Sequence, residues 1–134
     1  MKKDIVPPTV EDVAVAIIQE ENEVGETEWN AFLINLKKEK MEGVLVTSQG
    51  YGVFDGQDVK TSTLRHFLDE IKPGNFSKIE PVVENLFGLN NEYWVSFYIN
   101  NVMYDKKYIF LPETIKEENF TQIPYINKKG VMIK

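Results

Sequence analysis

Residues 92–111, EYWVSFYINNVMYDKKYIFL, decide the fold class. Two runs rich in aromatic and β-branched residues, which strands favour, flank the pair Asn100-Asn101. Asparagine tolerates the left-handed backbone that a tight hairpin turn requires. The stretch therefore predicts two antiparallel strands within an antiparallel sheet.

The first of these strands is apolar on both faces. Alternation turns four of its side chains to one face, and Trp94 and Tyr98 to the other, with Tyr104 and Tyr108 nearby on the next strand. An uncovered patch of this kind usually marks a partner surface, so the sequence predicts an interaction surface at Trp94, Tyr98, Tyr104 and Tyr108. The alternative is a second core, in which the C-terminal segment 121–134, expected to be extended, covers the four rings.

Other strands are expected along the chain. Residues 10–21 fit both helical and strand spacing, and we favour a strand because Val and Ile dominate. A turn around Gly25 leads into 27–37, and the polar residues 37–42 predict a hairpin loop to 44–54. Residues 77–87 then begin a three-stranded meander, in which Pro81 requires an edge or a bulge.

A helix is predicted over residues 64–71, where apolar residues recur at i, i+3, i+4 and i+7 (Leu64, Phe67, Leu68, Ile71). Hydroxyls at 61–63 are candidate N-caps, and Pro73-Gly74 ends the helix. A short second helix is expected in PETIKEENF, 112–120. The expected fold is thus one α+β domain over residues 1–134, with a single antiparallel sheet of about six strands and the main helix on one face.

Composition excludes several classes of function. The chain has 134 residues, 15 Lys+Arg against 21 Asp+Glu, and a net charge of −6, so nucleic acid is an unlikely partner. It has no Cys, which excludes disulfides and thiolate chemistry and favours a cytoplasmic location. No apolar run reaches the ~20 residues of a membrane-spanning helix, and the first 21 residues do not read as a signal peptide.

An anion or ligand site is the second candidate. It would use the loop 50–63 and the N-terminus of the predicted helix, where free N–H groups and the helix dipole attract anions. Its residues are Lys60, Thr61, Ser62, Thr63, Arg65 and His66. The alternative is ordinary capping by the hydroxyls, with Arg65 and His66 paired to Asp69 and Glu70 on an exposed helix face.

Catalytic and metal motifs are weak. Ser62 and His66 are four residues apart, but no third group orients the imidazole, and the loop 50–63 lacks P-loop spacing. Asp55 and Asp58 lack the spacing of a calcium loop. No cofactor, metal or catalytic residue is predicted.

Four stretches resemble a group of short bacterial hypothetical proteins, along nearly the whole chain: WNAFLIN, VLVTSQGYG, KTSTLRHFL and LNNEYWVSFY. Some members carry the label phenylalanyl-tRNA synthetase subunit, which the resemblance would extend to this chain. The residues do not support that activity, because such subunits are several times longer and the chain has neither an ATP-binding class motif nor a basic RNA surface. The resemblance supplies no functional residue.

The sequence thus favours a non-enzymatic protein that binds a partner, or a second copy of itself, through an aromatic sheet face or a sheet edge. The alternative is a small-ligand or anion-binding accessory domain using the 50–63 loop. A pocket near residues 60–65 would favour the second function, and an uncovered Trp94 and Tyr98 face the first.

Overall fold

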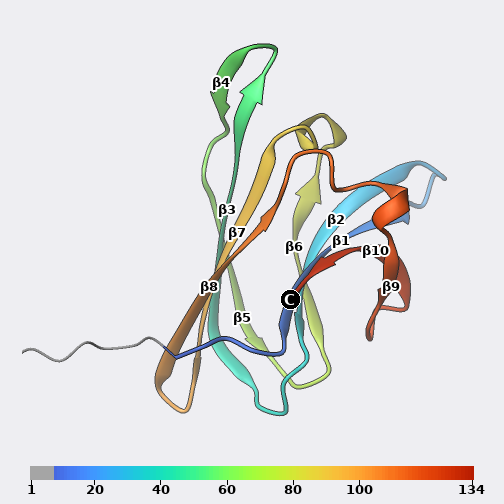
Figure 1. Ribbon diagram of the computed structural model, residues 1–134. Coiled ribbons are helices and arrows are strands. Elements are labelled where there is room, and N and C mark those ends of the chain that lie inside the picture. Colours follow the sequence, from blue (N-terminus) through green and yellow to red (C-terminus); the bar gives the residue numbers. More distant parts are fainter. Residues whose placement is uncertain (1–7) are drawn as a thin grey trace, which may run out of the picture.

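The computed structural model describes residues 8–134 and consists of two antiparallel five-stranded sheets that lie face to face (Figure 1). Apart from strands, the described residues form two single 3-10 turns, η1 (Glu84–Leu86) and η2 (Glu117–Asn119). The fold is therefore all-β, and the expected α+β fold is wrong. No helix in this part of the chain is long and apolar enough to span a membrane.

Sheet A has the strand order β6-β2-β1-β10-β9. Its strands are β1 (Val13–Glu21), β2 (Thr27–Asn35), β6 (Phe76–Val82), β9 (Thr121–Ile123) and β10 (Lys128–Ile133). β1 and β2 form a nine-pair hairpin, which confirms the strand expected at 10–21 and the turn around Gly25. Pro81 lies on the edge strand β6, as the missing N–H requires.

Sheet B has the order β4-β3-β7-β8, and β5 also pairs with β3. Its strands are β3 (Met41–Phe54), β4 (Gln57–Lys60), β5 (Leu64–Ile71), β7 (Asn90–Ile99) and β8 (Val102–Phe110). The early part of the long strand β3 pairs with β5 and its end pairs with β4, so the two short strands share one edge. β8 forms the opposite edge.

The expected single sheet is wrong because the chain changes sheets between strands that were expected to pair. β2 lies in sheet A and β3 in sheet B, so residues 37–42 connect two sheets and do not close a hairpin. β6 and β7 are separated in the same way, which leaves only the β7–β8 hairpin of the expected meander. In that hairpin Asn100 and Asn101 both have positive φ, as the sequence predicts.

The predicted helix over 64–71 is also wrong, because this segment is strand β5. Its apolar residues recur at helical spacing, but the segment pairs with β3 and makes its backbone hydrogen bonds to that strand. Asp69, at a φ of 65°, marks an irregularity that shifts the register, so Leu68 and Ile71 pack inward while Phe67 points outward. The expected helix in 112–120 is only the turn η2.

The main core lies between the two sheets. Inward side chains of β1 and β2 pack there against those of β3, β7 and β8. The largest fully buried side chains are Tyr93, Phe97, Tyr108 and Phe110. The Tyr108 hydroxyl donates a hydrogen bond of 2.8 Å to the backbone oxygen of Val13, which ties the sheets together.

A second apolar cluster covers the outer face of sheet A. Side chains of β1 and β2 on this face pack against β9, β10 and the turn that joins them, and the buried members are Ala14, Ala16, Ile18, Phe32, Ile34 and Ile123. The ring of Tyr125, in that turn, lies against Gly74 beside β6 at the far edge of the sheet. The C-terminal segment therefore closes sheet A, and does not cover the rings of sheet B as the second-core alternative required.

Candidate functional site

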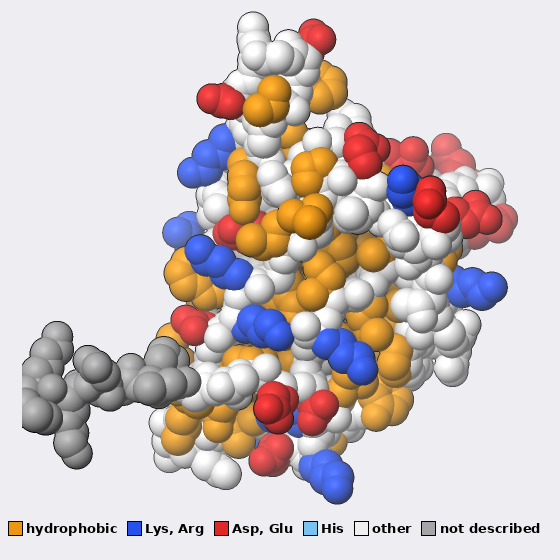
Figure 2. Space-filling view, viewed as in Figure 1, with side chains coloured by type: hydrophobic (Ala, Val, Ile, Leu, Met, Phe, Trp, Pro, Cys, Tyr) orange, Lys and Arg blue, Asp and Glu red, His pale blue; other side chains and the backbone are white. Residues whose placement is uncertain are grey.

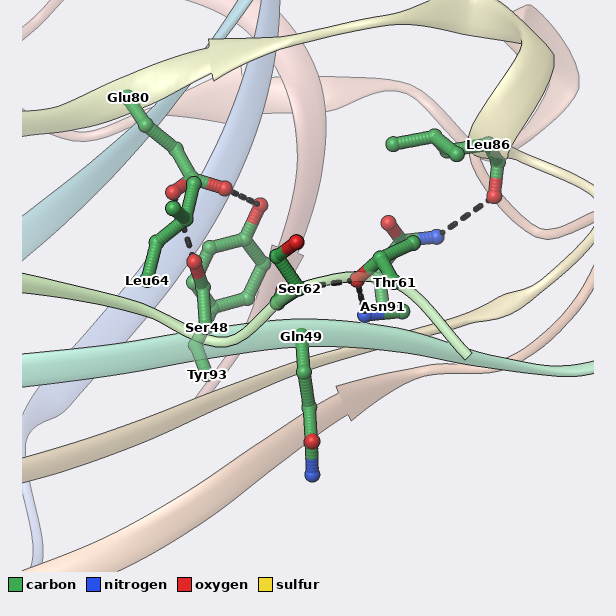
Figure 3. A pocket seen from close by; sticks show the side chains of 10 residues that line it. Ser48, Gln49, Thr61, Ser62, Leu64, Glu80, Leu86, Asn91 and Tyr93 are labelled. Atoms are coloured by element: carbon green, nitrogen blue, oxygen red, sulfur yellow. Dashed lines mark hydrogen bonds between the residues drawn. The ribbon is translucent and has the colours of Figure 1, made fainter. Parts of the chain in front are cut away.

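A polar cavity of about 270 Å³ opens between the two sheets, where the β4–β5 connection passes over β3 (Figure 3). β3, the 61–64 segment and β7 supply most of its wall, and β6 and η1 supply the remainder. The lining residues are Ser48, Gln49, Gly50, Thr61, Ser62, Leu64, Glu80, Leu86, Asn91 and Tyr93.

Two hydrogen bonds to Gly50 hold the β4–β5 connection at the opening of the cavity. The Thr61 backbone N–H donates to the Gly50 oxygen at 2.8 Å, and the Thr61 hydroxyl accepts from the Gly50 N–H at 2.8 Å. The same hydroxyl donates to the Ser62 oxygen at 3.0 Å. The hydroxyl expected to cap a helix therefore secures a strand connection.

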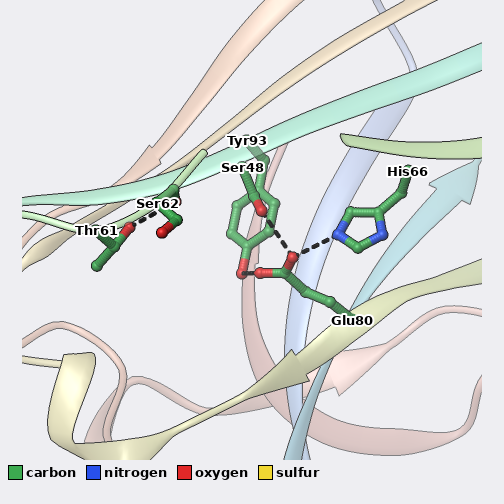
Figure 4. A network of polar contacts seen from close by, with 6 residues as sticks. All are labelled: Ser48, Thr61, Ser62, His66, Glu80 and Tyr93. Carbon is green, nitrogen blue, oxygen red and sulfur yellow. Dashed lines mark hydrogen bonds and ion pairs between the residues drawn. The ribbon is translucent and has the colours of Figure 1, made fainter. Parts of the chain in front are cut away.

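The carboxylate of Glu80 is the centre of a hydrogen-bond network on the cavity wall (Figure 4). Its Oε1 accepts from the Ser48 hydroxyl at 2.7 Å and from His66 Nε2 at 2.7 Å. Its Oε2 accepts from the Tyr93 hydroxyl at 3.4 Å. Glu80 comes from sheet A and its three partners from sheet B, so the network joins the sheets.

Tyr93 and Ser48 serve as donors in this network. Burial, and then the charge and hydrogen bond of Glu80, raise the pKa of Tyr93 well above its ordinary value, so the phenol keeps its proton. The Ser48 hydroxyl is bonded to the carboxylate and not to the imidazole, so the arrangement lacks the Ser–His contact of nucleophilic catalysis. No group of three or more metal-ligating side chains occurs among the described residues.

The sequence-predicted anion residues are divided by the fold. Thr61 and Ser62 line the cavity, and His66 binds Glu80 beside it. The Thr63 hydroxyl donates to Gln49 Oε1 at 3.4 Å. Lys60 and Arg65 are exposed and do not line the cavity, and no helix N-terminus exists at this place to attract an anion.

Glu80 is the functional candidate that the sequence did not reveal. It stands between Ile79 and Pro81, and both Ile79 and Glu80 turn away from solvent, because β6 has a register irregularity opposite Ala31 and Phe32. Strict alternation would place Ile79 and Glu80 on opposite faces of the strand. Because the bulge turns both inward, alternation in the sequence does not predict that the Glu80 carboxylate faces inward.

The outer face of sheet B is the second candidate. Trp94 and Tyr98 point out from β7 and are 42% and 45% exposed. Exposed apolar side chains on the neighbouring strands extend this face, namely Leu45, Phe67 and Met103. Tyr104 and Tyr108 belong instead to the inner face, where Tyr108 is buried and Tyr104 stacks on Phe97. The four predicted rings therefore do not form one surface.

Strand β8, whose outward side chains belong to this face, forms an open edge of sheet B. Seen from the side on which β8 lies in front, hydrophobic side chains run down the middle of the molecule, with Lys or Arg side chains among them and on both sides (Figure 2). On β8 itself, Lys107 lies over the Trp94 ring, with its Nζ 4.6 Å from the ring centroid. The edge thus presents charge next to an uncovered apolar face.

Comparisons of the chain with protein-family models, with curated proteins and with solved structures find no match.

Proposed function

We propose that the protein is a non-enzymatic interaction domain whose first partner is a second copy of itself, joined through the edge strand β8. The observation that carries the proposal is the charge order of β8, in which Asp105 and Lys107 flank Lys106 beside an uncovered apolar face. Antiparallel pairing of two β8 strands would extend sheet B across both copies, and the interface would be isologous.

Hairpin geometry identifies the backbone groups that are free to pair. A two-residue turn makes Ile99 and Val102 a hydrogen-bonded pair, and such pairs recur at every second residue. The N–H and C=O groups of Met103, Asp105, Lys107 and Ile109 therefore face away from β7. Among the described residues no other strand pairs with this side of β8.

One register suits the charges. With the two-fold axis at Lys106, Asp105 of each copy stands opposite Lys107 of the other, so the interface contains two pairs of opposite charges. The registers on either side place Asp105 opposite Asp105, or Lys107 opposite Lys107. Because opposite charges across an antiparallel pair stabilise it and like charges destabilise it, the first register is favoured.

The same register continues the apolar face. Met103, which pairs with Tyr98, would meet Ile109 of the second copy, so that the outer faces of the two sheets join. Lys106 opposes association, since it meets its own copy at the axis and edge lysines discourage strand pairing. Its ammonium lies over its own Tyr108 ring, 5.1 Å from the centroid, so two-fold symmetry directs the two charges apart. We therefore expect a weak, concentration-dependent dimer.

Charge reversal tests the proposal by analytical ultracentrifugation over a range of concentrations. Asp105→Lys and Lys107→Glu each place like charges opposite one another and should weaken dimerisation by about tenfold, while the double variant restores the pairing and the dimer. The control is Lys38→Glu, the same charge change at an exposed residue of the β2–β3 connection. A wild-type chain that stays monomeric at millimolar concentration, or a double variant no better than the single ones, would overturn the proposal.

A further inference from the structure

We infer that the polar cavity binds a small organic cation, an ammonium group on a compact apolar body, through the carboxylate of Glu80. The inference is independent of the proposed self-association, because the cavity lies between the sheets and β8 contributes nothing to its wall.

Size and shape suit a small molecule. The volume of about 270 Å³ lies near the lower end, ~300 Å³, of pockets that hold small ligands. Leu64 and Leu86 bring apolar side chains to a wall whose other residues are mostly of polar type, as Figure 3 shows. A ligand with a polar head and a short apolar body would contact both kinds of surface.

Except for the Ser62 hydroxyl, the hydroxyl and amide donors that line the cavity are engaged within the protein. The Ser48 and Tyr93 hydroxyls donate to Glu80, and the Thr61 hydroxyl donates to the Ser62 oxygen. Both bonds from Asn91 Nδ2 go to backbone oxygens, those of Leu86 at 3.0 Å and Leu89 at 3.1 Å. These groups retain oxygen lone pairs, so the cavity offers acceptors to a ligand that donates.

Glu80 has the largest remaining acceptor capacity. An ionised carboxylate provides about four lone-pair sites, and this one has three protein donors. Two of them share Oε1 at 2.7 Å, whereas Oε2 receives only the 3.4 Å contact from Tyr93. With 15% of its side chain exposed, the carboxylate is accessible but shielded from water, which strengthens a charge-assisted hydrogen bond.

The charge of the wall selects a cation. Glu80 is the acidic lining residue, and neither Lys nor Arg lines the cavity. Lys60 and Arg65, the cations that the sequence assigned to an anion site, point elsewhere. An anion would meet the Glu80 carboxylate without a compensating positive side chain in the wall, whereas an ammonium would donate to Oε2 and to the neighbouring oxygens.

Matched probes test the inference by ¹H–¹⁵N NMR titration. Cyclohexylamine, cyclohexanol and cyclohexanecarboxylate share one ring and differ in charge, and ethanolamine, ethylene glycol and glycolate form a smaller set. We expect at least one amine to shift the Ser48, Ser62 and Tyr93 amide resonances saturably, with the alcohol and carboxylate of the same set much weaker. Glu80→Gln should lower the affinity for that amine by about tenfold or more, because it removes a hydrogen bond to a charged group.

The matched control is Glu28→Gln, the same chemical change at an exposed residue of β2, which should leave the titration unchanged. If Glu80→Gln does not give a folded spectrum, Ser62→Leu serves as the second variant, since it narrows the mouth without touching the network. Three outcomes would overturn the inference: no response to either amine at millimolar concentration, an equal response to the alcohol or the carboxylate, or amine binding that survives in the variants.

Discussion

The two sheets of this protein both carry apolar side chains on their outer faces, but the part of the chain that the structure describes covers only one of these faces. On sheet A, Ile18 and Ile34 are buried beneath the C-terminal hairpin β9–β10 and its turn. On sheet B, Phe67 and Trp94 lie on the corresponding outer face and are 69% and 42% exposed. Within residues 8–134, the hairpin at the C-terminal end closes sheet A.

The difference shows that similar alternation patterns have different consequences. Sheet A gains a second core, so its outward residues contribute to folding. Sheet B keeps large apolar side chains in water beside an unpaired edge strand, an arrangement that usually marks an interaction surface. Substitutions on the two outer faces should therefore change different quantities, stability on sheet A and association on sheet B.

The largest expected effect compares Ile34→Ala with Phe67→Ala in denaturant unfolding. Ile34 is fully buried on the covered face, so its truncation should lower the free energy of unfolding by about 2–5 kcal/mol. Phe67 is mostly exposed, and its truncation should cost less than about 1 kcal/mol. Equal losses in the two variants would mean that the outer face of sheet B is buried in the folded chain, and would remove the contrast.

A smaller effect compares an inward tyrosine with an outward one. Tyr108→Phe leaves the Val13 backbone oxygen without its donor and should cost about 1–3 kcal/mol, whereas Tyr98→Phe on the exposed face should be nearly neutral. Urea titrations of both variants at neutral pH measure the two losses.

Tyr108→Phe should also change how stability depends on pH in alkaline solution. Burial raises the pKa of Tyr108 far above its ordinary value of 10.0, so the folded chain holds the proton that the unfolded chain releases first. This contribution to stability is complete below about pH 10 and is lost as the pH rises above it. Wild-type stability should fall more steeply above pH 10 than that of Tyr108→Phe. Parallel profiles for the two chains would contradict the raised pKa.

Much of the strand content was predictable from sequence, because alternation and turn residues act locally. The β1–β2 and β7–β8 hairpins follow from short turns between apolar runs. The division into two sheets depends on which distant strands pair, and no local pattern in 37–42 distinguishes a hairpin loop from a crossover. The 64–71 segment has helical spacing and becomes a strand because β3 offers it a partner.

For the candidate sites, too, the sequence indicated features that depend on neighbouring residues and missed those that depend on the fold. Thr61, Ser62 and His66 were recognised as polar residues next to a loop, and the fold brings them to the cavity or beside it. Glu80 was missed because a bulge turns it inward. The aromatic set was divided by register, since Tyr93 pairs with Tyr108 across the Asn100-Asn101 turn and paired residues share a face.

Amide hydrogen exchange along β8 shows directly whether the open edge of sheet B pairs with a second copy. In dilute protein, the amides of Asp105 and Lys107 face away from β7 and should exchange fast, while those of Tyr104, Lys106 and Tyr108 are protected. As the concentration rises, we expect protection to appear at Asp105 and Lys107 in the wild type, and not in Asp105→Lys. Fast exchange at both amides at every concentration, in a chain that stays folded, would contradict it.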